Sequence, residues 1–258
     1  MDLDIRGLRV LVTAGASGIG LEIARAYITE GAKVHICDID DNALAAANKS
    51  DPILTLSHAD VSDRGAVARL FDNALHALNG LDVLVNNAGI AGPTGRVEEI
   101  HPDDWDRCLS VCLTSQFNCA RLAIPVLRQS SNASIVNLSS MAGRLGFALR
   151  APYAAAKWGV IGFTKSLAIE LGPDRIRVNA ILPGLVAGDR QRRVLESKAQ
   201  QQGVSYSEIE KRAFSFTSIK DYVTPQQIAA QILFLTSRWG VTISGQAIQI
   251  CGDTKILA

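Results

Sequence analysis

A tyrosine and a lysine four residues apart, Tyr153 and Lys157, form the pair in this sequence that is best suited to acid–base chemistry. On a helix, positions i and i+4 lie on one face, so the lysine ammonium would stand one turn from the phenol and favour its phenolate form. A phenolate held in this way can take or return a proton near neutral pH. By itself such a pair is common, and a solvated pair on a helix surface is then the better interpretation.

A serine at the end of an apolar run strengthens the acid–base interpretation. Ser140 follows the run at residues 134–139 and precedes Tyr153 by 13 positions. In a doubly wound parallel sheet, the carboxyl ends of the strands line the ligand crevice. We therefore expect Ser140, Tyr153 and Lys157 to meet in one cleft.

A glycine-rich segment, residues 13–20, joins the first apolar run to a helical pattern. Glycines at a strand-to-helix turn allow the backbone to approach a pyrophosphate, and the helix N-terminus supplies N–H donors. A tight turn without a ligand is the alternative, but the strand before and the helix after favour a dinucleotide site. The spacing is closer to G-x-x-x-G-x-G than to G-x-G-x-x-G.

Asp38 ends the second apolar run and predicts which dinucleotide is bound. A carboxylate at this place can accept hydrogen bonds from both ribose hydroxyls and would repel a 2′-phosphate. Ser17 is neutral and no arginine directly follows Asp38, so the sequence favours NAD over NADP. A surface aspartate at a strand end is the alternative.

The elements that must position these residues alternate between short apolar runs and longer helical patterns. Strands are predicted at residues 8–13, 33–37, 53–57, 81–86, 134–139, 176–182 and 247–250. Helices are predicted near 18–30, 40–48, 63–78, 102–128, 151–172 and 225–237. This alternation predicts an α/β fold, a single doubly wound parallel sheet of Rossmann type with helices on both faces. We expect one domain over residues 1–258, with a polar insertion at about 185–222 that serves as a substrate lid.

Composition narrows the class of protein. The chain has 258 residues, 48% of them hydrophobic, and a formal net charge of +1 with 5% aromatic residues. A near-neutral, aromatic-poor chain argues against a nucleic-acid partner. The N-terminus lacks a signal-peptide pattern and no apolar run reaches membrane-spanning length, so we expect no membrane partner. The five cysteines form no C-x-x-C pair and are interpreted as buried free thiols rather than a metal site, which fits a reducing cytoplasm.

Taken together, the motifs resemble those of the short-chain dehydrogenase/reductase superfamily over about the whole chain. The motifs are residues 13–20, the Asn86-Asn87-Ala88-Gly89 segment, Ser140, Tyr153 with Lys157, and Pro183-Gly184, in the order and spacing of the family. The resemblance implies an NAD-dependent oxidoreductase that transfers hydride between the nicotinamide and a secondary alcohol or carbonyl. It also implies a homo-oligomer, often a tetramer.

The resemblance assigns a role to each matching residue. Ser140 would bind the substrate oxygen, Tyr153 would exchange its proton, and Lys157 would hold the nicotinamide ribose and tune Tyr153. Asp60 and Val61 would contact adenine. The residues implied in cofactor binding are Gly15, Ser17, Gly18, Ile19, Gly20, Asp38, Asp60, Val61, Asn87, Ala88, Gly89, Tyr153, Lys157, Pro183, Gly184 and Val186.

Four positions depart from the family pattern. Ala14 stands where the first glycine of the phosphate motif is usual, and we expect a shifted turn there rather than lost binding. Residues 185–188 lack the threonine that often follows Pro-Gly, and Cys251-Gly252-Asp253 replaces Asp-Gly-Gly. Cys112 occupies the position of a helix-borne asparagine, and Gln116, four residues on, is a partial substitute for it.

Arginines near the expected cleft bear on the substrate. Arg190, Arg192, Arg193 and Lys198 outnumber Asp189 and Glu196 in the insertion, and Arg144 and Arg150 lie between Ser140 and Tyr153. Arginine suits carboxylate, sulfonate or phosphate groups, which favours a small polar substrate such as a sugar, sugar acid or hydroxy acid. A solvated helix face or a subunit contact is the alternative for these charges. Two other functions stay open: a non-catalytic NAD-binding relative, and an NADPH-dependent ketoacyl or steroid reductase.

Overall fold

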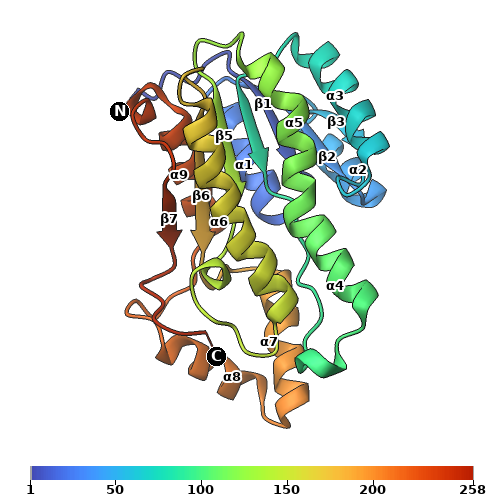
Figure 1. Ribbon diagram of the computed structural model, residues 1–258, viewed down its shortest axis with the longest axis vertical. Helices are drawn as coiled ribbons and strands as arrows, with labels where there is room; N and C mark the ends of the chain where they lie inside the picture. The colour runs from blue at the N-terminus through green and yellow to red at the C-terminus, as the bar shows by residue number, and fades with distance from the viewer. Residues whose placement is uncertain (1, 258) are drawn as a thin grey trace.

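The computed structural model describes residues 2–257, so Met1 and Ala258 of the predicted domain lie outside the described residues. Seven parallel strands form one sheet in the order β3-β2-β1-β4-β5-β6-β7 (Figure 1). The strands are β1 (Arg9–Thr13), β2 (Lys33–Asp38), β3 (Thr55–His58), β4 (Val83–Asn86), β5 (Ser134–Leu138), β6 (Arg177–Pro183) and β7 (Ala247–Ile250). Each begins and ends within two residues of its predicted position, which confirms the doubly wound parallel sheet.

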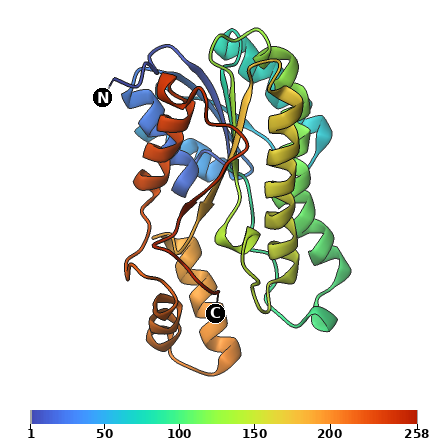
Figure 2. The same ribbon diagram turned by 60° about the vertical axis from the view of Figure 1, so that its left-hand side comes forward.

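Helices cover both faces of the sheet in two separate layers (Figure 2). One layer holds α1 (Gly18–Thr29), α2 (Asp41–Ser50) and α9 (Pro225–Thr236). The other holds α3 (Arg64–Leu78), α4 (Pro102–Leu109), α5 (Ser115–Leu127) and α6 (Ala151–Leu171). Within the described residues, no helix has both the length and the apolar content needed to cross a bilayer.

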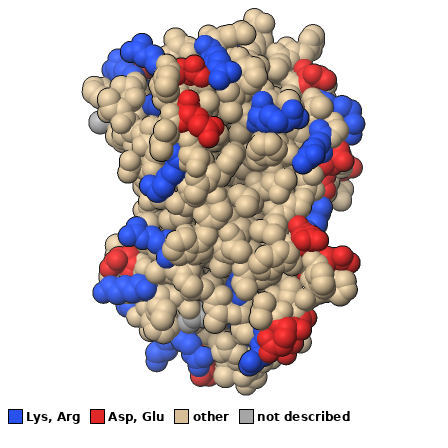
Figure 3. Space-filling model, viewed as in Figure 1, with Lys and Arg blue, Asp and Glu red and all other residues tan. Residues whose placement is uncertain are grey.

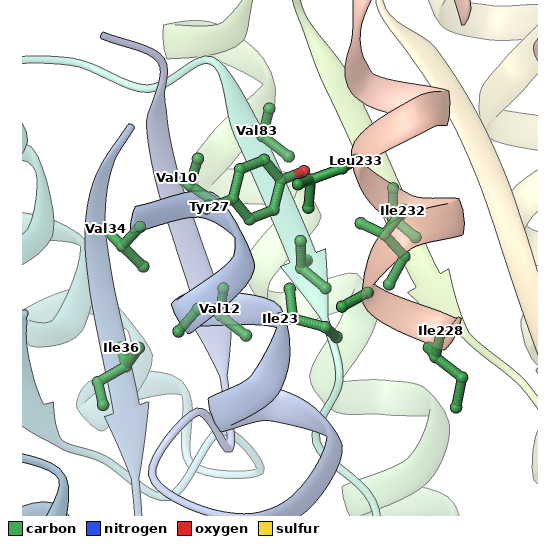
Figure 4. Close-up of a cluster of buried hydrophobic side chains, with 14 of the residues drawn as sticks. Val10, Val12, Ile23, Tyr27, Val34, Ile36, Val83, Ile228, Ile232 and Leu233 are labelled. Atoms are coloured by element: carbon green, nitrogen blue, oxygen red, sulfur yellow. The ribbon is translucent and has the colours of Figure 1, made fainter. Parts of the chain in front are cut away.

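The core beneath α1 and α9 shows how sequence pattern becomes packing. Val10 and Val12 of β1 meet Ile23 and Tyr27 of α1, and Ile232 of α9 closes the cluster (Figure 4). Burial of such side chains stabilises the fold by roughly 1.5–3 kcal/mol each. The Tyr27 hydroxyl, which has no access to solvent, is hydrogen-bonded to Thr236 Oγ1 of α9 at 2.6 Å, so this buried polar group has a partner.

The central strands are buried along their whole length. Every residue of β4, β5 and β6 is buried, whereas β3 and β7 at the sheet edges are partly exposed. A strand that is covered on both faces is mostly apolar rather than alternating, and the buried amides of Asn86, Asn137 and Asn179 in these strands are hydrogen-bonded. The central strands therefore hold their carboxyl ends firmly in place.

The predicted insertion contains two helices, α7 (Asp189–Gln202) and α8 (Tyr206–Ser215), beyond the carboxyl ends of the strands (Figures 1 and 2). They pack on each other through Leu195, Ala199 and Ile209. The two ends of the α7–α8 segment are paired, since Ala187 N donates to Val223 O at 2.9 Å and Val223 N donates to Leu185 O at 2.8 Å. The segment thus leaves and re-enters the body of the protein at one narrow neck.

Candidate active site

One cavity of about 620 Å³ lies at the carboxyl ends of the central strands. The sheet order places β2 and β4 on opposite sides of β1, and the point where the strand order reverses is where doubly wound sheets bind ligands. The cavity runs from Asp38 at one end to Ser140, Tyr153 and Lys157 at the other. Residues that lie far apart in the sequence therefore meet in one site.

The turn between β1 and α1 is tightly packed against the loop after β4. A Cβ atom on Gly20 would approach Ala14 O at 2.1 Å and Asn87 Nδ2 at 2.6 Å, so only glycine fits there. Asn87 Nδ2 donates to the carbonyls of Thr13 and Ala14, both at 3.0 Å. These contacts leave the first turn of α1 free to face the cavity, where Ser17, Gly18 and Ile19 line the wall.

Ala14 overturns the expectation of a shifted turn. Its backbone has φ of +49°, the left-handed conformation in which glycine is the usual residue. A Cβ in that conformation costs roughly 1–2 kcal/mol. The packing of Gly20 and Asn87 holds the turn in place, and the alanine adopts the strained angle instead of moving the turn.

Thr13 is a site residue that the sequence did not single out by its side chain. Its hydroxyl accepts hydrogen bonds from the backbone N–H groups of Asn87 and Ala88, both at 3.0 Å. This side chain is 1% exposed and ties the end of β1 to the loop after β4. The signal that could have identified Thr13 is a polar residue at the end of an otherwise apolar run.

Two aspartates lie at the far end of the cavity from Tyr153. Asp38 Oδ1 accepts from Ile39 N at 2.8 Å and Asp40 N at 3.2 Å, and Asp38 Oδ2 accepts from Ala16 N at 3.2 Å. The carboxylate is thus fixed at the end of β2, against the β1–α1 turn. Asp38 therefore lines the cavity with its carboxylate held in a fixed orientation.

Asp60 is fixed by a different set of donors. Its carboxylate accepts from Ser62 N at 2.9 Å, Ser62 Oγ at 2.6 Å and Arg107 Nη1 at 3.2 Å. Burial alone would raise the pKa of Asp60, yet the hydrogen bonds from Ser62 and Arg107 hold this pKa below its usual value. Asp60 and Val61 line the same end of the cavity as Asp38.

Ser140, Tyr153 and Lys157 line the other end of the cavity together. Lys157 Nζ donates to Leu138 O at 2.7 Å and lies 5.7 Å from the centre of the Tyr153 ring. Ser139 Oγ donates to Lys157 O at 2.7 Å, which ties α6 to the end of β5. The lysine is 3% exposed, so its ammonium is held at the cavity wall by the backbone of β5.

Cys112 lies in a π-helical turn, Ser110–Thr114, which divides the predicted 102–128 helix into α4 and α5. Its Sγ accepts from Ile90 N and donates to Ile90 O, both at 3.4 Å, so the thiol is bonded to the peptide groups on either side of Ile90. A hydrogen bond between the thiols of Cys108 and Cys112 raises the pKa of Cys108 and lowers that of Cys112. π-turns recur at functional sites, and this one lies directly behind Tyr153.

Gln116 lies closer to Lys157 than the sequence alone could tell. Its Nε2 donates to Cys112 O at 3.4 Å and to Leu138 O at 3.3 Å, the same carbonyl that accepts from Lys157. Gln116 Oε1 is buried without a hydrogen-bond partner among the described residues. The amide of Gln116 and the ammonium of Lys157 therefore share one acceptor, although Gln116 stands four residues from the asparagine position at Cys112.

The remaining predicted cofactor residues also reach the cavity, with two exceptions. Ser17, Gly18, Ile19, Asn87, Ala88, Gly89, Pro183, Gly184 and Val186 line it. Gly15 does not, because it packs against Ile36, and Gly20 does not, because it packs against Ala14. These two glycines shape the turn rather than the cavity surface.

The charged residues of the predicted substrate end separate into two groups. Arg150, Arg190 and Arg193 line the cavity together with Lys198. Arg144 is exposed outside it, and Arg192 pairs with Asp189 and Glu196 on the surface of α7. The chain segment after β7 also reaches the cavity through Thr254, Ile256 and Leu257, which the sequence did not predict.

All five cysteines are buried and free. In the described part of the chain, no group of three histidine, cysteine or acidic side chains is arranged to hold a metal ion.

The chain matches a family described as enoyl-(acyl carrier protein) reductase over residues 13–252. It is 32% identical over 246 residues to D-beta-hydroxybutyrate dehydrogenase of Cupriavidus necator, covering 93% of this chain and 95% of that protein. It is 35% identical over 254 residues to a probable galactose dehydrogenase of Rhizobium meliloti, covering 96% and 95%.

Solved structures of other proteins are also similar to this chain. A point variant of actinorhodin polyketide ketoreductase, solved with NADPH, superposes with a TM-score of 0.90 at 31% identity, covering 95% of this chain and 96% of that one. The L-sorbose reductase of Gluconobacter frateurii, solved with NADPH and L-sorbose, gives 0.91 at 25% identity and 99% coverage of each chain. The shared features are the fold and the nicotinamide-dependent chemistry named for these proteins.

Proposed function

The chain belongs to the short-chain dehydrogenase/reductase superfamily and is an oxidoreductase acting on CH–OH groups, and we propose that it is NAD-dependent and oxidises or reduces a small polar substrate. The observation that carries the proposal is the continuous cavity that joins Asp38 to Ser140, Tyr153 and Lys157. The substrate classes in view are sugars, sugar acids and hydroxy acids.

The cavity suits a dinucleotide in shape and chemistry. At the β1–α1 turn, Gly20 lets the backbone close on Asn87 where any Cβ would clash, and α1 directs its N-terminal N–H groups into the cavity. Asp38 supports NAD, because a fixed carboxylate at the ribose would repel a 2′-phosphate. Bound NAD would supply the hydride acceptor.

The chain's own residues manage the proton and the orientation of the substrate. In oxidation, Tyr153 would take the hydroxyl proton at its phenolate oxygen, and Ser140 would hydrogen-bond the same substrate oxygen. Lys157, anchored on Leu138 O, would favour the phenolate by its charge. Positioning of this kind lowers the barrier because the reacting groups no longer have to find one another.

The test is a turnover assay with a panel of secondary alcohols, NAD and NADP, followed at the absorbance of the reduced cofactor. We expect turnover of at least one sugar, sugar acid or hydroxy acid, with higher kcat/KM for NAD. Equal or better use of NADP would contradict the cofactor assignment, and preference for a ketoacyl or steroid substrate would favour that reductase class. NADH binding without any turnover would favour a non-catalytic relative.

We also propose that the α7–α8 segment acts as a lid and that the chain forms a homotetramer. Arg190 of α7 supports the first proposal, since its Nη1 reaches across to Gly89 O at 3.1 Å. Figure 3 supports the second: the middle of the face formed by α5 and α6 carries few charges, and Phe117 and Trp158 there are 44% and 52% exposed. Light scattering should give the mass of four chains, and Trp158→Glu should lower it.

A further inference from the structure

Arg150 is a buried cation at the catalytic end of the cavity. It stands at the N-cap of α6, three residues before Tyr153, and is 3% exposed. Its guanidinium carbon lies 5.3 Å from the centre of the Tyr153 ring and 5.5 Å from that of Phe147. The cation is thus held between two aromatic rings, one of which is the proposed proton acceptor.

The hydrogen bonds of Arg150 are incomplete. One terminal nitrogen, Nη2, donates to Ala91 O, while the buried Nε has no partner among residues 2–257. No carboxylate of the described chain lies within ion-pair distance of this guanidinium. The other arginines that line the cavity are exposed, so water can solvate their charges, whereas Arg150 is buried. Burial lowers the pKa of Arg150, but a guanidinium stays protonated in proteins. A buried charge without a counter-charge is costly, and such groups mark functional sites.

The surroundings of Arg150 strengthen the positive potential. Arg190 and Arg193 line the same end of the cavity, and Lys198 Nζ lies 4.2 Å from the centre of the Phe147 ring on which Arg150 also rests. Among residues 2–257, the acidic side chains that line the cavity are those of Asp38 and Asp60 at the far end and that of Asp189, which is largely exposed on α7. An anion entering the cavity is therefore drawn toward Tyr153 and not toward the Asp38 end.

We propose, on the basis of the proposed function above, that the substrate is a short hydroxy acid whose carboxylate or sulfonate binds Arg150 while its carbinol oxygen reaches Ser140 and Tyr153. Guanidinium groups bind such oxyanions through paired hydrogen bonds, and Nε of Arg150 is a buried donor that lacks a partner among residues 2–257. Because Arg150 is in contact with the Tyr153 ring, few carbon atoms fit between the anionic group and the reacting carbon. A long or uncharged substrate leaves the guanidinium unsatisfied.

The test compares matched probes on the unmodified protein with NAD: 3-hydroxybutyrate, its sulfonate counterpart 2-hydroxypropane-1-sulfonate, the neutral methyl ester of 3-hydroxybutyrate, and the corresponding series of short hydroxy acids and esters. We expect kcat/KM for an anionic probe to exceed that of its ester by at least about fiftyfold, as the loss of a charge-assisted hydrogen bond implies. Comparison of kcat/KM for 3-hydroxybutyrate and for its sulfonate counterpart shows which of the two anionic groups the site prefers. Turnover of esters or neutral alcohols with no anionic preference would overturn the anion site while leaving the oxidoreductase function standing.

Substitutions of Arg150 and Arg144 test whether the anionic group of the substrate contacts Arg150. Arg150→Met should raise KM for the anionic probe by at least about a hundredfold and leave that for the ester within about threefold, and Arg150→Lys should recover part of the loss. Arg144→Met removes the same charge from the same loop outside the cavity and should change neither value.

Calorimetric titration of 3-hydroxybutyrate and the sulfonate into the protein with NADH separates binding from turnover. Binding that disappears in Arg150→Met supports the site even if no probe turns over, in which case only the proposed function fails. No binding of any anionic probe to the unmodified protein, or equal binding to Arg150→Met, would overturn the inference.

Discussion

The two ends of the cavity are built in different ways. At the Asp38 end, the surface combines the backbone and small residues of the β1–α1 turn with Asp38 and Asp60, whose carboxylates are fixed by hydrogen bonds, and the closest packing is that of Gly20 against Ala14 and Asn87. At the Tyr153 end, long side chains from β5, α6, α7 and the segment after β7 converge. The first end suits a ligand shared by many enzymes, while the second depends on a few charged side chains. In a fold that many enzymes share, the specific function depends on site side chains such as those at the Tyr153 end.

The largest difference between the two ends should appear in Tyr153→Phe. Removing the phenol oxygen abolishes the proton acceptor but leaves the Asp38 end intact, so we expect kcat to fall by about 10³-fold, roughly 4 kcal/mol. NADH affinity, measured by fluorescence titration, should stay within about threefold of its original value. A matching loss of NADH binding would mean that the two ends are not independent.

The strand that carries Asp38 also contains a buried histidine whose protonation should set the stability in acid. His35 of β2 is hydrogen-bonded to Thr55 Oγ1 and Ser57 Oγ, both at 2.9 Å, and burial lowers its pKa to about 4. Below about pH 6.5 the unfolded chain binds the proton more readily, so stability is lost as pH falls from there toward the folded-state pKa. This amounts to about 2 kcal/mol between about pH 7.5 and 5.

Urea unfolding at the two pH values measures this dependence. His35→Gln should reduce the difference between them, whereas His101→Gln, at a largely exposed histidine, should leave it unchanged. An undiminished difference in His35→Gln would assign the acid sensitivity to another group.

Asp38→Ala tests whether the Asp38 end alone selects the cofactor. Without the carboxylate, the repulsion of a 2′-phosphate is gone, and the ratio of kcat/KM for NAD to that for NADP should fall by at least about tenfold, roughly 1.4 kcal/mol. Asp41→Ala removes the same charge from a side chain that is 80% exposed and should leave the ratio unchanged. If both variants shift the ratio equally, general charge and not the ribose contact is responsible.

Cys112→Asn should change kcat by less than about tenfold, below roughly 1.4 kcal/mol. Gln116 already shares the Leu138 carbonyl with Lys157, so restoring an amide at Cys112 adds little. Gln116→Met keeps the volume but removes the donor, and its effect on kcat should be the larger of the two. A protein that binds NADH yet gains turnover only in Cys112→Asn would contradict the catalytic interpretation.

Ala14→Gly should give the smallest effect, a gain in stability of about 1 kcal/mol, because it relieves the positive φ. That gain corresponds to roughly 2–4 °C in Tm. Ala16→Gly lies in the same turn without a positive φ and should lower Tm instead. A fall in Tm for both variants would show that Ala14 is not strained.

The Asp38 end was predicted more completely from the sequence than the Tyr153 end. Period and composition located every strand to within two residues, and the glycine spacing and Asp38 follow from local geometry. What the sequence could not give was distance between segments: that Arg150 enters the cavity whereas Arg144 does not, and that Leu257 reaches it. Those facts depend on tertiary packing of long, flexible side chains, on which sequence period carries no information.

One local prediction failed, and one confirmed helix contains a feature that the sequence did not predict. Ala14 was expected to shift the turn, but the packing around Gly20 outweighs the cost of one strained residue. The helix predicted at 102–128 contains a π-turn at Ser110–Thr114, which no residue type announces. In both cases tertiary contacts decide the local backbone.

The narrow neck of the α7–α8 segment has a consequence for how this protein can change. Ala187 and Val223 are joined by hydrogen bonds and the segment packs on its own small core. Just after α8, Ser218 N and Ile219 N donate to Gly252 O beyond β7, so the stretch from Gly188 to Ser215 is the part whose length and content are least coupled to the sheet. Loop-closure entropy changes only slowly with length, so a replacement stretch between the same two anchor points would fold onto an unchanged scaffold. Natural variation, or grafting in the laboratory, can therefore exchange residues 188–215 and redirect the enzyme to new metabolites without rebuilding its cofactor-binding half, as long as the contact between residues 216–219 and the stretch after β7 is kept.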